Sequence, residues 1–378
     1  MRDAVIVEAV RTPIGRRAGA LSQTHPAELS AHILRSVVER SGVAAEEIDD
    51  VIWGCVMQAS EQAGNIARTA VLAAGLPESV PGTTLTRACG SSQQAVSFAA
   101  ATVIAGHADF VVAGGVESMS RVPMGTAGQG GSPTPPSVLE RYGVQEFSQG
   151  LGAEMVAEKW GFSRTQLDEY SLRSHELSAQ AVDAGAFDAQ LAPVPGTELT
   201  QDEGIRRGGT LEKLGKLRTV FKEDGVIHAG NASQISDGAG ALLITTGEIA
   251  RERGLTPLAR VHTSAVAGDD PVIMLTGPIA ATAKALGRSG LSIDDIGAFE
   301  VNEAFAPVPL AWQAETGAAM DRMNPLGGAI AVGHPLGGSG AILMTRLIHH
   351  MRDNGIRYGL QTMCEAGGMA NATILELL

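Results

Sequence analysis

One cysteine, Cys89, stands where a short strand is expected to end and a helix to begin. A β-prone run covers residues 84–86, and an Ala-rich segment with apolar residues at helical spacing extends to Ala105. Unpaired backbone N–H groups and the positive end of a helix dipole favour a thiolate over a thiol at such a place. Cys89 is therefore a candidate covalent nucleophile, although a lone cysteine is more often a small buried hydrophobe.

Three further residues could take part in chemistry with Cys89. His334 lies in a glycine-rich stretch, 327–340, that would let a ligand approach the backbone closely, and a histidine beside Cys89 would act as its general base. Asn302 ends an expected strand, where it could cap a helix or donate its amide N–H to a developing oxyanion. Cys364 could be inert or could serve as a second acid/base.

Strands that alternate with helices must hold these residues in place. Apolar runs predict buried strands at 5–10, 50–54 and 110–115, and helical spacing of apolar residues predicts a helix over 27–40. This alternation is typical of an α/β architecture with a mostly parallel sheet.

The chain also repeats itself weakly. The tripeptide Ile-Asp-Asp begins at Ile48 and again at Ile293, each time after an Arg-Ser-Gly segment, and the same spacing separates Cys89 from His334. Two related halves would place Cys89 and His334 in equivalent strand-to-helix turns, side by side at the junction of the halves. A Cys–His pair is then geometrically plausible.

The middle of the chain differs from both halves. Residues 125–136 are rich in Gly, Ser, Thr and Pro and predict an irregular loop, whereas 153–160 and 165–184 have helical patterns, the second opened by a capping signal at Ser163. Six basic residues follow: Arg206, Arg207, Lys213, Lys216, Arg218 and Lys222. They form a candidate phosphate-facing patch, although a solvated charged face is the commoner outcome.

The repeat and the middle segment together predict three units. Residues 1–117 and 236–256 should form an N-terminal half that carries the nucleophilic cysteine. Residues 257–378 should form a C-terminal half with the asparagine, the histidine and the second cysteine. The segment 118–235 should form a loop domain between them.

Composition limits the classes of function. The 378 residues carry a formal net charge of −13, which argues against a general nucleic-acid binder. The three cysteines show no CxxC spacing and the nine histidines no ligand pattern, so no metal site is predicted. No apolar run is long enough for a membrane span, and neither end carries a targeting signal, which predicts a cytoplasmic protein without a membrane partner.

Four blocks together resemble the signature blocks of the thiolases (acetyl-CoA C-acyltransferases). They are Cys89-Gly-Ser-Ser, Asn302-Glu-Ala-Phe-Ala, Gly333-His-Pro-Leu-Gly-Gly-Ser-Gly, and Cys364 followed by glycines, in the order of that family. The likeness extends over essentially the whole chain. It implies the five-layered αβαβα fold of two related halves, with an inserted loop domain that binds coenzyme A.

The resemblance also implies a role for each residue. Cys89 would take up the acyl group, and His334 would activate Cys89 and help to form an oxyanion hole in which Asn302 positions a water. Cys364 would move the proton at the α-carbon of the second acyl-CoA. The backbone N–H groups of Cys89 and Ala366 would form a second oxyanion hole.

Coenzyme A and acyl-CoA are expected as substrates rather than as a permanently bound cofactor. The block that ends at Ser233, Gly-Asn-Ala-Ser, resembles the family segment that contacts the pantetheine part of coenzyme A, and Arg206 matches the family's basic residue near the nucleotide. The resemblance further implies a homodimer or a homotetramer.

Two departures from the family pattern bear on the substrate. Ala366 replaces a usual glycine, so its backbone donor requires that alanine can adopt the needed backbone angles. Ser148-Gln149 replaces the His-Met pair of biosynthetic acetoacetyl-CoA thiolases, which favours a degradative thiolase of lipid breakdown that accepts longer or bulkier 3-oxoacyl-CoA substrates. We therefore expect thiolysis through an acyl-Cys89 intermediate. An acetoacetyl-CoA-specific biosynthetic thiolase, a β-ketoacyl synthase of the same fold and a catalytically inactive acyl-CoA- or lipid-binding relative remain as alternatives.

Overall fold

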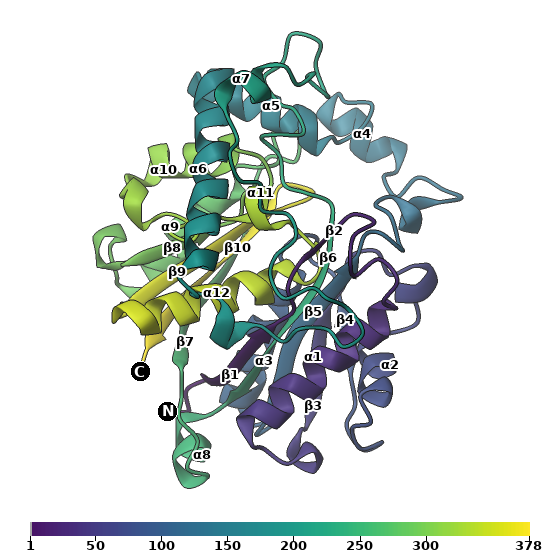
Figure 1. Ribbon diagram of the computed structural model, residues 1–378, viewed down its shortest axis with the longest axis vertical. Helices are drawn as coiled ribbons and strands as arrows, with labels where there is room; N and C mark the ends of the chain where they lie inside the picture. The colour runs from purple at the N-terminus through teal and green to yellow at the C-terminus, as the bar shows by residue number, and fades with distance from the viewer. Residues whose placement is uncertain (1) are drawn as a thin grey trace.

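The computed structural model describes residues 2–378, in which strands and helices alternate along most of the chain (Figure 1). The strands are β1 Val5–Arg11, β2 Gly15–Arg16, β3 Asp50–Gly54, β4 Thr83–Leu85, β5 Val111–Ser118, β6 Ser236–Thr245, β7 Ala259–Gly268, β8 Ala298–Val301, β9 Tyr358–Glu365 and β10 Met369–Leu377. The α-helices are α1 Pro26–Ser41, α2 Ile66–Ala73, α3 Ser91–Ala105, α4 Pro136–Tyr142, α5 Gln149–Trp160, α6 Arg164–Asp183, α7 Leu211–Gly215, α8 Gly247–Glu252, α9 Gly277–Ser289, α10 Pro307–Thr316, α11 Ala329–Val332 and α12 Ser339–Asn354.

The strands form one hydrogen-bonded order, β4-β3-β5-β6-β1-β7-β10-β9-β8, with β2 paired to β6. Parallel pairing joins β4 to β3, β3 to β5 and β8 to β9, whereas β6, β1, β7 and β10 pair antiparallel with their neighbours. The prediction of a mostly parallel sheet was therefore wrong. In each half, an antiparallel strand lies beside the parallel ones: β6 pairs with β5, and β10 pairs with β9. The three-residue turn 366–368 between β9 and β10 permits only antiparallel pairing.

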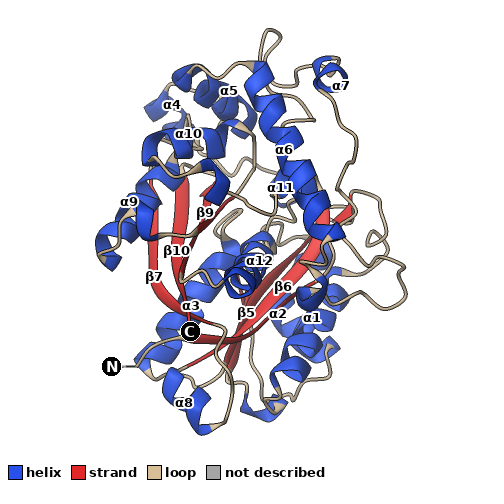
Figure 2. Cartoon of the chain, turned by 60° about the vertical axis from the view of Figure 1, so that its left-hand side comes forward, coloured by secondary structure: helices blue, strands red, loops and turns tan. Residues whose placement is uncertain are grey.

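Three apolar clusters separate the sheet from its helices and produce five layers. One cluster packs α1 and α2 on the outer face of the N-terminal strands, and another packs α9 and α10 on the outer face of the C-terminal strands. The third surrounds α3 and α12, which lie between the two parts of the sheet (Figure 2). This confirms the predicted αβαβα fold.

The two halves repeat in the predicted order but in a different register. Helices α1 and α9 end at left-handed Gly42 and Gly290, and a single 3-10 turn follows each of them before the next strand. This register aligns Ile48 with Ile296, whereas the sequence match had paired Ile48 with Ile293.

The same shift applies at the central helices. Gly90 and Gly338 are the N-cap residues of α3 and α12, so the residue equivalent to Cys89 is Gly337 and not His334. His334 still belongs to the turn that leads into α12. The shared Ile-Asp-Asp tripeptide was misleading because glycine helix caps, rather than that tripeptide, mark equivalent backbone positions.

Side-chain amides and hydroxyls hold the two central helices together at their N-termini. Gln361, on β9, connects them: its Nε2 donates to Gln93 Oε1 of α3 at 2.9 Å and to the Gly340 carbonyl of α12 at 2.8 Å. The Ala341 N–H donates to Ser92 Oγ at 2.9 Å, and a side chain at Gly340 would overlap the backbone of Gln93. The starts of α3 and α12 are thereby fixed against each other, which is where the candidate site residues lie.

Helices α4 to α7 gather at one end of the layered body (Figure 1). Helix α6 begins with the predicted capping box, in which Ser163 and Gln166 satisfy each other's backbone N–H groups. We propose the division expected from the sequence, with 118–235 as a loop domain between the halves 1–117 with 236–256 and 257–378. None of the described helices has the length and apolarity that a membrane crossing requires.

Candidate active site

Cys89 sits in a tight turn between β4 and α3. Ala88, directly before it, has φ +43°, a left-handed conformation that costs about 1 kcal/mol for a residue with a Cβ. Two hydrogen bonds hold the turn: Ser91 Oγ donates to the Ala88 carbonyl at 2.5 Å and accepts from the Arg87 N–H at 2.9 Å. The turn places Cys89 one residue before the N-cap Gly90, as the sequence predicted.

His334 follows helix α11 in a turn that only a glycine can form. Gly333 has φ +108°, and a side chain there would overlap Ser236 Oγ. The His334 N–H donates to the Gln234 carbonyl at 3.1 Å, which fixes the backbone next to the imidazole.

A hydrogen-bond chain defines which ring nitrogen of His334 carries the proton. Ser339 Oγ donates to the Pro335 carbonyl at 2.9 Å, so its oxygen accepts from His334 Nδ1–H at 2.6 Å. His334 Nε2 is therefore the unprotonated nitrogen, and Asn302 Nδ2 lies 3.5 Å from it. The imidazole is in the tautomer that a general base at Nε2 requires.

Ser339 lies in the same block as His334, but no role was predicted for it from the sequence; its hydroxyl orients the imidazole through Nδ1. We expect Ser339→Ala to lower kcat by about 10- to 100-fold with little change in KM, because the imidazole would lose its orientation and its preferred tautomer. Steady-state kinetics measures this. Ser171→Ala is the matched control, since Ser171 Oγ makes the same type of bond to a carbonyl four residues earlier in α6, outside the site. Equal losses in both variants would contradict the assignment.

Asn302 extends the strand ladder and does not cap a helix. Its N–H donates to the Thr362 carbonyl at 3.0 Å, and helix α10 begins only at Pro307 with Ala306 as N-cap. The capping prediction was wrong because the chain makes a short loop between β8 and α10. Asn302 Oδ1 is buried without a hydrogen-bond partner among the described residues, so this oxygen is free to accept from a ligand or a water.

Glu303 anchors the loop that carries Asn302. Both carboxylate oxygens accept hydrogen bonds, Oε1 from the Tyr170 hydroxyl at 2.8 Å and Oε2 from Ser174 Oγ at 2.6 Å. The Ile330 N–H also donates to Oε2, at 3.1 Å. One carboxylate thus connects helix α6, the Asn302 loop and helix α11, which leads to the catalytic histidine candidate.

Cys364 lies at the end of β9 and is 1 % exposed. Ala366 begins the turn to β10, in which Gly367 and Gly368 take the left-handed conformations and Ala366 does not. The alanine therefore occupies its position without the backbone strain that the departure from glycine had suggested.

Burial sets the protonation of the site. Burial, together with the carboxylates of Glu365 and Glu117, raises the pKa of Cys89 to about 12. Burial and the nearby Cys89 raise the pKa of Cys364 well above its ordinary value, and burial lowers the pKa of His334 to about 4. The sequence had favoured a Cys89 thiolate at the helix N-terminus. In the structure, desolvation outweighs that effect, and the resting site holds two thiols and a neutral imidazole.

A cavity of about 210 Å³ reaches the site. Its lining contains His334 and the coenzyme A candidate Ser233, and it is mainly apolar: Met119, Met124, Gln149, Phe221, Ala232, Ser233, Gln234, Ile235, Ala304, Phe305, His334 and Leu336. Leu336 also packs against the cluster that contains Cys89. Of the four candidates, His334 lines the cavity itself, and Asn302 Nδ2 lies 3.5 Å from its imidazole. Cys364, on β9, lies near enough to Cys89 for Cys89 to raise its pKa.

The segment before Ser233 is fixed to helix α6. Asp168 Oδ1 accepts from Asn231 Nδ2 at 3.1 Å and lies 2.8 Å from His228 Nε2. The Ser233 N–H donates to the Ala304 carbonyl at 2.9 Å, next to the loop of Asn302. Ser233 therefore has a fixed position between the loop domain and the catalytic candidates.

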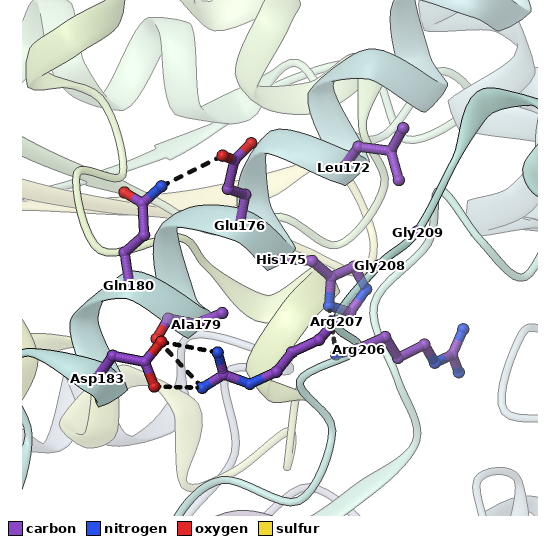
Figure 3. Close-up of a pocket in the computed structure, with 10 residues that line it drawn as sticks. All are labelled: Leu172, His175, Glu176, Ala179, Gln180, Asp183, Arg206, Arg207, Gly208 and Gly209. Carbon is purple, nitrogen blue, oxygen red and sulfur yellow. Dashed lines mark hydrogen bonds and ion pairs between the residues drawn. The ribbon is translucent and has the colours of Figure 1, made fainter.

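Arg206 lies apart from these residues, in a second cavity of about 410 Å³ beside α6 (Figure 3). Its N–H donates to His175 Nδ1 at 3.0 Å, while its side chain is exposed and extends away from the imidazole. The Arg207 guanidinium forms an ion pair with Asp183, with Nη2 2.7 Å from Oδ1. The Gly204 carbonyl, close in the chain, accepts from Gln234 Nε2 at 2.9 Å, which connects this segment to the lining of the first cavity.

The predicted basic patch is only partly available to a ligand. Three of its cations have carboxylate partners: Arg207 with Asp183, Lys216 with Glu212 and Lys222 with Glu158. Arg206, Lys213 and Arg218 have no carboxylate within 4.0 Å among residues 2–378, and Lys213 Nζ donates to the Gly208 carbonyl at 3.1 Å. Much of the patch is thus a solvated face, and Arg206 remains as a cation that a phosphate could pair with.

Comparison with known proteins matches the whole chain to one family. The family model described as "Thiolase, N-terminal domain" matches residues 4–248, and "Thiolase, C-terminal domain" matches residues 255–377. The chain is 49 % identical to a steroid 3-ketoacyl-CoA thiolase of Mycobacterium tuberculosis, over 100 % of this chain and 95 % of the relative.

Two further relatives and a solved structure are also similar to this chain over its whole length. A 3-ketoacyl-CoA thiolase of Aliivibrio fischeri and a 3-oxoadipyl-CoA/3-oxo-5,6-dehydrosuberyl-CoA thiolase of Escherichia coli are each 43 % identical, over 100 % of both chains. The crystal structure of the Bacillus anthracis acetyl-CoA acetyltransferase superposes with a TM-score of 0.92 at 38 % identity, covering 100 % of this chain and 99 % of that one.

Proposed function

The chain belongs to the thiolase family, and from this premise we propose which of its residues perform each step of its reaction. It is an acetyl-CoA C-acyltransferase of the degradative type, which cleaves a 3-oxoacyl-CoA with coenzyme A to give acetyl-CoA and a shortened acyl-CoA. The observation that supports the residue assignment is the proximity of the four side chains: His334 Nε2 lies 3.5 Å from Asn302 Nδ2, Leu336 from the His334 turn packs against Cys89, and Cys89 raises the pKa of Cys364.

In the first step, Cys89 attacks the 3-oxo carbon of the substrate. His334 Nε2, which carries no proton at rest, takes the proton of the thiol as the C–S bond forms. Both groups are buried and neutral, so the charge separation becomes favourable only when the developing oxyanion is stabilised at the same time. The backbone N–H groups of Cys89 and Ala366 are the donors we assign to that oxyanion.

The carbon–carbon bond then breaks and leaves acetyl-CoA as an enolate. A water held by Asn302, together with His334 Nε2–H, stabilises the enolate oxygen, and Cys364 delivers a proton to its carbon. Coenzyme A next gives its thiol proton to the Cys364 thiolate and attacks the acyl-Cys89 thioester. As the acyl–Cys89 bond breaks, the departing Cys89 thiolate takes its proton back from His334 Nε2–H. The shortened acyl-CoA leaves, and both cysteines end as thiols with His334 neutral.

Coenzyme A binding is assigned to Ser233 and Arg206. Ser233 lines the cavity of His334 and would contact the pantetheine part, and the free guanidinium of Arg206 would pair with a phosphate of the nucleotide.

We expect Arg206→Ala to raise KM for coenzyme A by about 10-fold with little change in kcat, because one charge-assisted contact contributes about 1.4 kcal/mol or more. Arg207→Ala is the matched control, since Arg207 is the adjacent arginine and is engaged with Asp183. It should change KM by less than about 2-fold. If Arg207→Ala raised KM as much as Arg206→Ala did, a diffuse basic surface rather than a specific arginine would bind the nucleotide.

We also assign the acyl group to the longer or bulkier class. Ser148 Oγ accepts from the Leu151 N–H as the N-cap of α5, so it is occupied as a cap, whereas Gln149 lines the cavity. Gly150 packs flat on the Phe221 ring, where a side chain would overlap the ring. Two methionines, Met119 and Met124, add adaptable apolar surface. The name of the steroid 3-ketoacyl-CoA thiolase supports the same class.

A thiolysis assay with acetoacetyl-CoA, a long straight-chain and a ring-bearing 3-oxoacyl-CoA tests the function. We expect cleavage with a higher kcat/KM for the long or ring-bearing substrates. A preference for acetoacetyl-CoA would support the biosynthetic alternative, and coenzyme A binding without cleavage of any substrate would support an inactive binding protein. We further propose a cytoplasmic homodimer or homotetramer with no nucleic-acid or membrane partner.

A further inference from the structure

One buried carboxyl group beside the reacting cysteines has no hydrogen-bond partner. Glu365 directly follows Cys364 at the end of β9, is 0 % exposed, and has neither Oε1 nor Oε2 in a hydrogen bond among the described residues. A buried carboxylate without partners is costly, whereas a neutral carboxyl costs far less. None of the steps assigned to Cys89, His334, Asn302 and Cys364 uses the Glu365 carboxyl.

Strand geometry and a glycine direct Glu365 to the start of α3. Alternate residues of a strand share a face, so Glu365 lies on the face of Met363, which packs against Cys89. A side chain at Gly90 would overlap Glu365 Oε1 and crowd Asn371 Nδ2. The carboxyl therefore fills the space beneath the residue that follows Cys89.

Other buried acids nearby are bound differently. Glu303 and Glu117 accept hydrogen bonds at both of their oxygens, and each holds a loop of the site in place. Glu365 makes no such bond, so structural anchoring does not explain it.

The charges around Glu365 favour its neutral form. Burial raises the pKa of Glu365 to about 8 even though Arg87, in the turn before α3, acts to lower it. The titratable groups that face Glu365 are Cys89, on the turn before α3, and Cys364, on the same strand. A charged Glu365 raises the pKa of both cysteines, and Glu117 on β5 also raises the pKa of Cys89.

We propose that Glu365 is a positioning residue that controls the charge state of the site: Cys89 and Cys364 form thiolates readily only while the Glu365 carboxyl is uncharged. This rests on the proposed function in that these two cysteines are the reacting thiols. Above about pH 8 the carboxyl ionises, and a second negative charge beside it becomes unfavourable. Ionisation of Glu365 therefore opposes thiolate formation at alkaline pH. The thiols alone, whose pKa values are high, would simply form more thiolate as the pH rises.

Alkylation of Cys89 by iodoacetamide, followed by peptide mass spectrometry across pH, tests the proposal without any thiolase substrate. The thiolate forms a C–S bond as the C–I bond breaks and iodide leaves, so the rate follows the thiolate fraction. In the wild type, the logarithm of the rate should rise with pH, flatten over roughly one pH unit from about pH 8, and then rise again.

The variant Glu365→Gln should lack this flattening. At about pH 9.5 its Cys89 should react about 10-fold faster than the wild type, and at about pH 6.5 the two rates should agree within about 2-fold, because a pKa change of one unit is tenfold in thiolate. Glu300→Gln is the matched control: burial also raises the pKa of Glu300, to about 7, but the charges acting on Glu300 are those of Arg346, Glu303 and Arg11. It should leave the alkylation profile unchanged.

Stability supplies a second readout. The pKa of Glu365 in the folded protein lies above its ordinary value of 4.5, so between these two values the native state holds a proton that the unfolded state has released. The free energy of unfolding therefore falls as pH rises from about 4.5 to 8. Glu365→Gln should therefore have a higher Tm than the wild type near pH 8.5 and an equal Tm near pH 4.5.

A wild-type rate that rises with one unbroken slope to pH 10 overturns the proposal, even if no variant folds. So does a Glu365→Gln variant whose Cys89 reacts no faster at high pH. Failure of the proposed function would instead appear as absence of acyl transfer to Cys89, which the alkylation experiment does not measure.

Discussion

Replacement of Cys89 by alanine is expected to lower kcat for thiolysis by about 10⁴-fold or more. The substrate then has no covalent acceptor for its acyl group, and a carbon–carbon bond next to a ketone does not break without one. The buried alanine should fit the turn before α3, because only a sulfur atom is removed. Steady-state thiolysis of a 3-oxoacyl-CoA measures the loss.

Cys55 provides the control for Cys89. It is also a free, buried cysteine, and burial and Glu117 raise the pKa of its thiol above its ordinary value. Cys55→Ala should retain activity within about 3-fold at a modest loss of stability. Residual activity above about 1 % in Cys89→Ala would assign the acyl acceptor to another group.

Replacement of Cys364 by alanine is expected to separate two half-reactions. Protonation of the acetyl-CoA carbanion requires a positioned acid, so thiolysis should fall by about 10³-fold. Transfer of an acyl group from a saturated acyl-CoA to Cys89 should fall by less than about 10-fold, since a coenzyme A thiolate leaves far more readily than a carbanion. Rapid-quench mass spectrometry of acyl-Cys89 beside the thiolysis assay gives both rates.

Equal losses in the two half-reactions would contradict this separation. They would show that Cys364 supports the fold of the site or the activation of Cys89 rather than proton transfer at carbon. Cys364→Ser should recover part of the thiolysis if a proton at this position is what matters.

Much of the fold could be predicted because its signals are local. The capping signal at Ser163, the strand that leads into Cys89 and the alternation of strands and helices depend on residues a few positions apart. Strand pairing and repeat register depend on distant contacts instead. Sequence alone therefore suggested a mostly parallel sheet and aligned Cys89 with His334, whereas Gly337 is its structural equivalent.

The candidate site shows the same division between local and distant effects. The residue types and turns of Cys89, His334 and Cys364 could be predicted from sequence blocks. The protonation of Cys89 could not, because the burial and the Glu365 and Glu117 carboxylates that raise its pKa depend on parts of the chain far from Cys89 in sequence. The roles proposed for Ser339 and Glu365 could not be predicted either, because each depends on the atoms that tertiary packing places beside one hydroxyl or one carboxyl group.

The acyl-enzyme on Cys89 is the central claim, and one measurement tests it most directly. The protein is mixed with a 3-oxoacyl-CoA in the absence of free coenzyme A, quenched with acid, digested and analysed by mass spectrometry. We expect the mass of the shortened acyl group on the peptide that contains Cys89, and its loss when coenzyme A is added before the quench. An unmodified Cys89 peptide in protein that is active in thiolysis would contradict the account.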